Sequence, residues 1–293
     1  MTIDARPSAL LAAAGTGIQV GAAMVATRFA VDQAGPGSLA FLRYVVGVLC
    51  LLPFVLAMKR QPFATRDLAP MAALGIVQFG VLIALLNYAL QHIPSARAAL
   101  IFATFPLQTM LLSALIGRER LGAARVAGVA LSFAGVAVAL AGDAFGAETR
   151  GSHWLGTLAA FGSASCGAAC SVLYRPYVAR YPTLQVSAFA MFAAVLFLAL
   201  LAANEGFFLA TPRFTTSGWI AVLFIGFSSG IGYFLWLYAL GNAAPTLATM
   251  FMSLSPVTAA IGGALMLGEP VSMAAVAGLL CVIAGLWLAL RPG

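Results

Sequence analysis

Residues 88–121 read YALQHIPSARAALIFATFPLQTMLLSALIGRERL, and residues 238–271 read YALGNAAPTLATMFMSLSPVTAAIGGALMLGEPV. The second stretch follows the first at a constant offset of 150 positions, and the two align without a gap. In this alignment Pro106 meets Pro256, and each proline lies inside an apolar segment. The same pattern therefore occurs twice along the chain.

The composition is that of a membrane protein. Hydrophobic residues make up 62% of the 293 residues and charged residues 8%, against about 45–50% and about 25% in soluble domains. A helix needs roughly 20 apolar residues to cross a bilayer, and lipid cannot satisfy an open backbone, so we expect an all-α polytopic membrane protein. Its ten predicted transmembrane helices lie near residues 8–30, 36–58, 68–90, 95–116, 121–141, 153–175, 182–203, 216–240, 245–267 and 271–290.

The repeat sets the domain organisation. We place the N-terminal half at residues 1–146 and the C-terminal half at residues 147–293, with five spans in each. Because five is an odd number, the second half must cross the membrane in the opposite sense. The sequence therefore predicts two inverted five-helix repeats, an organisation that builds many secondary transporters.

The distribution of Lys and Arg predicts the orientation. With the N-terminus inside, ten of these residues fall on the cytoplasmic side and four outside, as the positive-inside rule requires. An even number of spans returns the C-terminus to the same side, so both termini are predicted to be cytoplasmic. We interpret the first apolar segment as a transmembrane helix and not as a removed signal peptide. The net charge of +7 follows from this loop bias, and no nucleic-acid partner is expected.

Matched prolines and glutamates mark each half. Pro106 and Pro256 fall near mid-membrane, where a proline removes a backbone hydrogen bond and kinks the helix. Matched interruptions of this kind point to a transporter's binding site, so we predict hinges that line the pathway, although proline is also common in membrane helices. Glu119 and Glu269 each begin a helix after a short turn. We predict that they are structural caps; proton coupling is the alternative.

Polar residues inside the spans are the candidate substrate contacts. Arg43 lies in the outer third of its span, where it either extends to the headgroups or faces a cavity and holds a substrate carboxylate. The neutral candidates either contact the solute or join helices by hydrogen bonds. They are Gln19, with Thr16 and Thr27 in the same stripe, and Gln78, Gln108, Ser229, Tyr233 and Trp236. No acidic residue is expected at mid-membrane, which favours neutral or zwitterionic solutes and facilitation or exchange over obligatory proton antiport.

Enzyme motifs do not fit their context. GFSSG at residues 226–230 matches a nucleophile elbow, but it lies within an apolar span and lacks the required strand. GTGIQVG at residues 15–21 has the wrong spacing for a nucleotide loop. The four cysteines lie within apolar spans and only two histidines occur, so no metal site is expected. We predict no catalytic residue and no cofactor.

The paired motifs, together with FLRY at residues 41–44, resemble the EamA branch of the drug/metabolite transporter superfamily. The resemblance covers nearly the whole chain. It implies two inverted five-helix bundles around a central cavity lined mainly by spans one, three, four, six, eight and nine. It also implies solute export from a bacterial inner membrane. Within the branch the chain is similar to YddG-type amino-acid exporters, but its first span, GIQVGAAMVATRF, lacks the tryptophan-containing LWS-like start common in the branch.

The sequence therefore predicts a membrane transporter that exports small neutral or zwitterionic metabolites by alternating access. Amino acids, either aromatic or of broad range, are the expected solutes, and the solute and the lipid bilayer are the expected partners. An intramembrane enzyme and a non-transporting scaffold are the alternatives, and within transporters so is export of other drugs or metabolites. The solute, the coupling ion, the direction of net flux and the oligomeric state are not fixed by the sequence.

Overall fold

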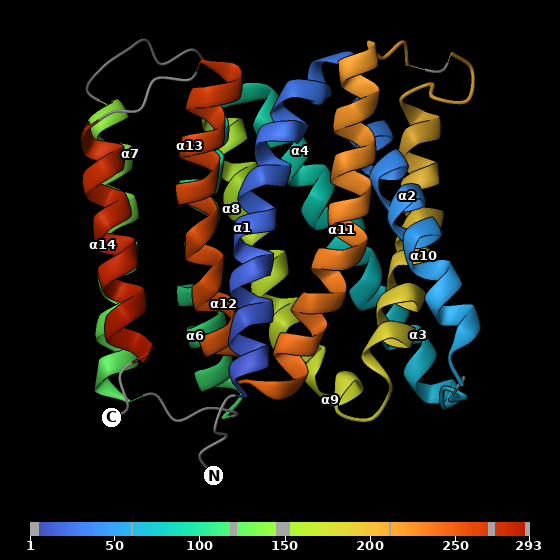
Figure 1. Ribbon diagram of the computed structural model, residues 1–293, viewed down its shortest axis with the longest axis horizontal. Helices are drawn as coiled ribbons and strands as arrows, with labels where there is room; N and C mark the ends of the chain where they lie inside the picture. Colours follow the sequence, from blue (N-terminus) through green and yellow to red (C-terminus); the bar gives the residue numbers. More distant parts are fainter. Residues whose placement is uncertain are drawn as a thin grey trace.

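The computed structural model describes the chain in six ranges, namely residues 6–59, 61–117, 122–144, 153–210, 212–268 and 273–290. Within these ranges the regular structure is helical throughout and no strand occurs. Long helices lie side by side in one bundle, with short connections at its two ends (Figure 1). The described residues thus confirm the predicted all-α fold.

The first half contains two uninterrupted spans, then two broken spans, then a last helix. The uninterrupted spans are α1 (Pro7–Ala30), followed by the 3-10 turn η1 (Val31–Gln33), and α2 (Pro36–Ala57). The third span comprises α3 (Thr65–Gly75), the π-helical segment η2 (Ile76–Val81) and α4 (Leu82–His92). The fourth comprises α5 (Ser95–Phe102) and α6 (Phe105–Leu115), and the fifth is α7 (Ala123–Ala144).

The second half repeats this order with different interruptions. Its first two spans are α8 (His153–Leu173), which the short α9 (Arg175–Val178) follows, and α10 (Thr183–Asn204). Its third span, α11 (Thr216–Asn242), is continuous. Its fourth comprises α12 (Pro245–Met250), the 3-10 segment η3 (Phe251–Leu254) and α13 (Ser255–Leu267), and its fifth is α14 (Met273–Leu290).

These helices match the predicted spans in number and position. Eight helical segments of the described chain are long and apolar enough to cross a membrane. Two shorter apolar helices, Ala123–Gly135 within α7 and Val276–Gly285 within α14, occupy the positions of predicted spans five and ten. The protein is therefore a polytopic membrane protein.

The two halves interlock in a symmetric way. α1 packs against α11 and α13, while its equivalent α8 packs against the matching helices α4 and α6. α2 packs against α10, and α7 against α14. α1 and α8 run in opposite directions through the bundle, and α1 begins at the end where α14 ends (Figure 1). In each half the first helix thus packs against the third and fourth spans of the other half, and the two first helices run in opposite directions. This is the arrangement of the inverted repeat that the sequence predicts.

Glycines allow the closest helix contacts of this arrangement. A Cβ at Gly226 of α11 would collide with the Val46 side chain of α2. At the matching contact in the other half, a Cβ at Gly75 of α3 would collide with the Ala190 backbone of α10. Small residues are what permit membrane helices to approach this closely.

Both predicted proline breaks are present. α5 ends at Phe102, and α6 begins at Phe105 with Pro106 in its first turn. In the other half the 3-10 segment η3 precedes α13, which has Pro256 in its first turn. A proline lacks the N–H that would bond the carbonyl four residues back.

The two breaks differ in how that carbonyl is satisfied. The carbonyl left by Pro256 is that of Met252, and the Ser255 hydroxyl donates to it at 2.7 Å. At the position matching Ser255, the first half has Phe105, which carries no hydroxyl. The carbonyl of Phe102 therefore has no counterpart of this bond.

One structural feature was not predicted, and two predictions are not tested by the described residues. The π-helical segment η2 was not predicted; such segments hold an extra residue per turn and often occur at functional sites. Glu119 and Glu269 lie outside the described residues, so their capping role stays a prediction. The exact division into residues 1–146 and 147–293 also stays a prediction.

Candidate functional site

A cavity lies between the two halves, deep inside the bundle. Its wall is formed by α1, α2, η2, α4, α5, α6, α11 and η3, and it has a volume of about 80 Å³. This volume is below the roughly 300–1,000 Å³ of typical small-molecule sites, so binding of a solute of that size requires the wall to open further. Thr16, Phe79 and Met252, which lie on three different spans, all line it. The site therefore depends on the folded arrangement of both halves.

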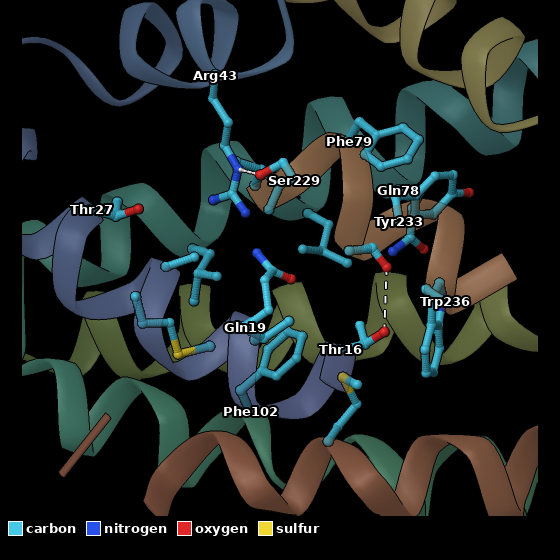
Figure 2. Close-up of a pocket in the computed structure, with 18 of the residues that line it drawn as sticks. Thr16, Gln19, Thr27, Arg43, Gln78, Phe79, Phe102, Ser229, Tyr233 and Trp236 are labelled. Atoms are coloured by element: carbon cyan, nitrogen blue, oxygen red, sulfur yellow. Dashed lines mark hydrogen bonds between the residues drawn. The ribbon is translucent and has the colours of Figure 1, made fainter. Parts of the chain in front are cut away.

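Six of the predicted contact residues line this cavity, and Figure 2 shows them around a common space. They are Gln19, Arg43, Gln78, Ser229, Tyr233 and Trp236. Thr16 and Thr27, from the same stripe as Gln19, line it as well. Gln108 is the exception, because its side-chain amide donates to Thr104 Oγ1 at 3.0 Å and it is not among the lining residues.

Arg43 turns into the cavity instead of extending to the bundle's end. Its side chain is 7% exposed, and its Nε donates to Ser229 Oγ at 2.6 Å. The Ser229 hydroxyl in turn donates to the carbonyl of Ile225 at 2.5 Å, which fixes its lone pairs toward Arg43. Among the described residues no carboxylate forms an ion pair with Arg43. A buried cation without a counter-charge is costly, so this arrangement needs an explanation.

A second arginine, at the bundle end where α1 begins, shows the contrast. Arg180 lies 2.6 Å from a carboxylate oxygen of Asp67, and Tyr181 donates to the same oxygen at 2.6 Å. The hydrogen bond that Arg180 donates to Asp67 raises the pKa of Arg180 above its ordinary value. This cluster satisfies its own charges and ties α3 to the start of α10. Arg43 has no such neutralisation from the described chain.

The polar stripe of α1 joins helices and also lines the cavity. The Gln19 amide donates to Ser228 Oγ of α11 at 3.1 Å. Thr16 Oγ1 lies 2.8 Å from the carbonyl of Ala12 and 3.3 Å from that of Gly232. Both interpretations of this stripe, helix pairing and cavity lining, therefore apply to the same residues.

Two buried polar atoms of the wall have no protein partner. They are Thr27 Oγ1 and Gln78 Oε1, for which no hydrogen bond occurs within the described part of the chain. Buried polar atoms in folded proteins are nearly always bonded. Unbonded polar atoms on a cavity wall are able to bond a polar solute or water.

Aromatic rings form the rest of the wall. The Phe79 ring lies 4.8 Å from Tyr44 and 4.1 Å from Tyr233 between centroids. Phe105, which precedes Pro106, lies 5.8 Å from Trp236 and so joins the first-half break to α11. Tyr44, Phe79 and Phe105 were not predicted as lining residues from the sequence. Their adjacency to Arg43, Gln78 and Pro106 was the available signal.

The lining differs from what the resemblance implied in one respect. Span two contributes Arg43 and Tyr44, whereas span six contributes none of the described lining residues. The close contact at Gly226 draws α2 against α11, which brings Arg43 to Ser229. Tyr174, just after span six, lies behind the wall, with its ring 6.2 Å from that of Tyr233.

Inverted repeats with interrupted helices beside a cavity in the membrane interior define a secondary-transporter architecture. Residues 7–141 and 154–291 match the EamA-like transporter family. The chain belongs to this family and is a membrane transporter.

Named relatives and a solved structure agree with this assignment. The chain is 31% identical over 274 residues to a "Probable terminal-alkyne amino-acid exporter" of Streptantibioticus cattleyicolor, covering 91% of this chain and 88% of the relative. It is 33% identical over 182 residues to the "Aromatic amino acid exporter YddG" of Ancylobacter novellus, covering 56% and 60%. It is 29% identical over 252 residues to the "Uncharacterized inner membrane transporter YedA" of Escherichia coli K12, covering 84% and 78%. A crystal structure at 25% identity superposes with a TM-score of 0.76 and covers 97% and 96%.

Proposed function

We propose that this transporter exports small neutral or zwitterionic metabolites, above all amino acids, across a bacterial inner membrane, with both termini in the cytoplasm. The observation that carries this proposal is the cavity between the two halves, whose wall combines Arg43, unpartnered polar atoms and aromatic rings. The names of two relatives as amino-acid exporters add support.

The substrate contacts in this proposal are the six predicted residues of the wall. Gln19, Gln78 and Tyr233 offer neutral hydrogen-bonding groups, Arg43 a positive charge held by Ser229, and Trp236 an aromatic face. No Asp or Glu belongs to the described wall, which supports facilitation or exchange over a carboxylate proton relay in the cavity.

Alternating access is the proposed mechanism. The breaks at Pro106 and Pro256 lie next to the cavity, because Phe105 and Met252 both line it. A helix that is already interrupted bends there without losing a further backbone bond. The two halves then rock around the solute, with the prolines as hinges. Gln108, bonded to Thr104 at the first break, belongs to the hinge and not to the solute site.

Reconstituted transport tests the function directly. Purified full-length protein in liposomes should accumulate radiolabelled amino acids against an internal pool of the same unlabelled compound. An intramembrane enzyme would change the solute chemically, and a scaffold would give no exchange. No exchange above protein-free liposomes for any of the twenty standard amino acids would overturn the proposal.

A further inference from the structure

The geometry points to a site that recognises its solute by the carboxylate and does not require an α-amino group. Arg43 would hold a carboxylate, and the aromatic wall an apolar tail. The solute class is then monocarboxylates with an apolar tail, of which amino acids are one subset. This inference rests on the proposed transport function and specifies its substrate class.

Arg43 is prepared for a carboxylate by the bond that it already makes. A guanidinium has five N–H donors in a planar fork. Ser229 occupies Nε, and Figure 2 shows the two terminal nitrogens beyond it, on the side that faces Gln19 across the cavity. Terminal nitrogens held in one plane match the two oxygens of a carboxylate. The solute thereby supplies the counter-charge that the described chain lacks.

An ammonium group meets no equivalent partner in the wall. The described lining contains no Asp or Glu, and Arg43 repels a second cation. Gln78 Oε1 and the Tyr233 hydroxyl oxygen line the cavity and are able to accept hydrogen bonds from an amino group. Such neutral acceptors tolerate an amino group, but they serve a water molecule equally well. The described wall therefore offers a charged partner to a carboxylate but none to an ammonium group.

The rest of the wall suits an apolar tail. Phe79, Phe105 and Trp236 present rings from three different helical segments. Small-molecule sites are commonly apolar enclosures with a few placed polar groups that set the orientation. With the carboxylate fixed at Arg43, the tail of the solute lies among these rings.

Four probes that differ only in their charged groups test this inference by thermal stabilisation of the full-length protein in detergent. They are L-phenylalanine, 3-phenylpropionate, phenethylamine and L-phenylalaninamide, with leucine, 4-methylpentanoate and isopentylamine as a second series. Both acids of each series should stabilise the protein, with half-saturation concentrations within about tenfold of each other, equivalent to about 1.4 kcal/mol. The amines and the amide should bind at least about tenfold more weakly.

Variants at the arginine give the matched controls. Arg43→Gln should weaken binding of 3-phenylpropionate by at least about tenfold, since hydrogen bonds to charged groups contribute more than neutral ones. Arg43→Lys should retain part of the affinity, because it keeps the charge but loses the fork. Ser229→Ala should weaken the acids less than Arg43→Gln and leave the amines unchanged. Arg28→Gln, at an arginine paired with Asp32 outside the cavity, should bind like the wild type.

Four results would overturn the inference. They are equal stabilisation by amine and acid, stabilisation by amino acids but not by their desamino acids, unchanged acid binding in Arg43→Gln, and no stabilisation by any acid up to about 10 mM. If Arg43→Gln does not fold, the probe series on the wild type still decides. Amino-acid exchange in liposomes that persists alongside any of these results would leave the proposed function intact. Acid binding without amino-acid exchange would support the carboxylate site and overturn the proposed amino-acid transport.

Discussion

α2 and α10 hold equivalent places in the two halves, and each has 22 residues. The offset that aligns Pro36 with Pro182 also aligns Arg43 with Phe189. Arg43 faces the cavity and bonds Ser229, whereas Phe189 packs with its ring 5.3 Å from that of Phe63. The fold accepts an aromatic ring at this position of the repeat, so the charge at Arg43 is not a requirement of the architecture. The scaffold is symmetric and the site is not.

Replacing Arg43 of α2 by the residue at the equivalent position of α10 should have the largest effect on transport. Arg43→Phe gives α2 the side chain of α10 and should lower amino-acid exchange by about 10- to 150-fold, the range of a lost charged hydrogen bond. Its melting temperature should stay level or rise, because replacing a buried ion by a packed apolar group is often neutral or stabilising. Exchange into liposomes and thermal unfolding measure the two effects. Phe189→Leu is the control and should keep exchange within about twofold, since it removes no hydrogen bond. Full exchange in Arg43→Phe would refute the asymmetric site.

The close helix contacts at Gly226 and Gly75 are similar in packing, but only the contact at Gly226 is expected to affect solute binding. Gly226→Leu and Gly75→Leu should each destabilise the protein by about 1–3 kcal/mol or prevent folding, because both force packed helices apart. Gly226→Ala and Gly75→Ala are the milder pair for binding measurements. Only the alanine at Gly226 should weaken 3-phenylpropionate binding per folded molecule, since only that contact sets Arg43 against Ser229. Equal loss in both variants would contradict the assignment.

The two prolines should differ in stability while sharing a functional effect. Pro106→Ala and Pro256→Ala both restore a continuous helix and should slow exchange several-fold. The new N–H should stabilise the first half more, by about 0.5–1.5 kcal/mol, because the Phe102 carbonyl lacks a hydroxyl donor that Met252 already has. Thermal unfolding in detergent compares the pair. Unchanged exchange in both variants would remove the hinge hypothesis.

The smallest effect should come from the hydroxyl at the second break. Ser255→Ala removes the hydroxyl donor to the Met252 carbonyl, which keeps the Ser255 backbone N–H as a donor, and should lower stability by about 0.5 kcal/mol. Ser165→Ala is a suitable control, because that hydroxyl bonds the carbonyl four residues back on an exposed, continuous helix. Thermal unfolding is again the measurement. A Ser255→Ala loss no greater than that of the control would show that the Ser255 backbone N–H alone satisfies this carbonyl.

The sequence predicted the spans, the repeat and most of the polar wall for one physical reason. Polar groups are rare within membrane spans. Those that occur there, such as Arg43 and Gln78, can therefore be recognised in the sequence as candidate functional residues. Gln108 does not line the cavity, because its side-chain amide bonds Thr104 one turn earlier. Phe79 was not foreseen because aromatic residues serve lipid contacts and cavities alike. The π-helical turn around it depends on neighbouring helices and leaves no composition signal.

The bond between Arg43 and Ser229 joins residues 186 positions apart, which has a consequence for biosynthesis. Because the ribosome works from the N-terminus, α2 must enter the bilayer before α11 has been made. An arginine at the centre of a span adds about 2.5–3.5 kcal/mol to the cost of insertion on translocon scales, and less nearer the surface. The remaining residues of α2 are largely apolar, which compensates for that charge. The apolar side chains of α2 thus allow it to insert with Arg43 before α11, which provides Ser229, has been synthesised.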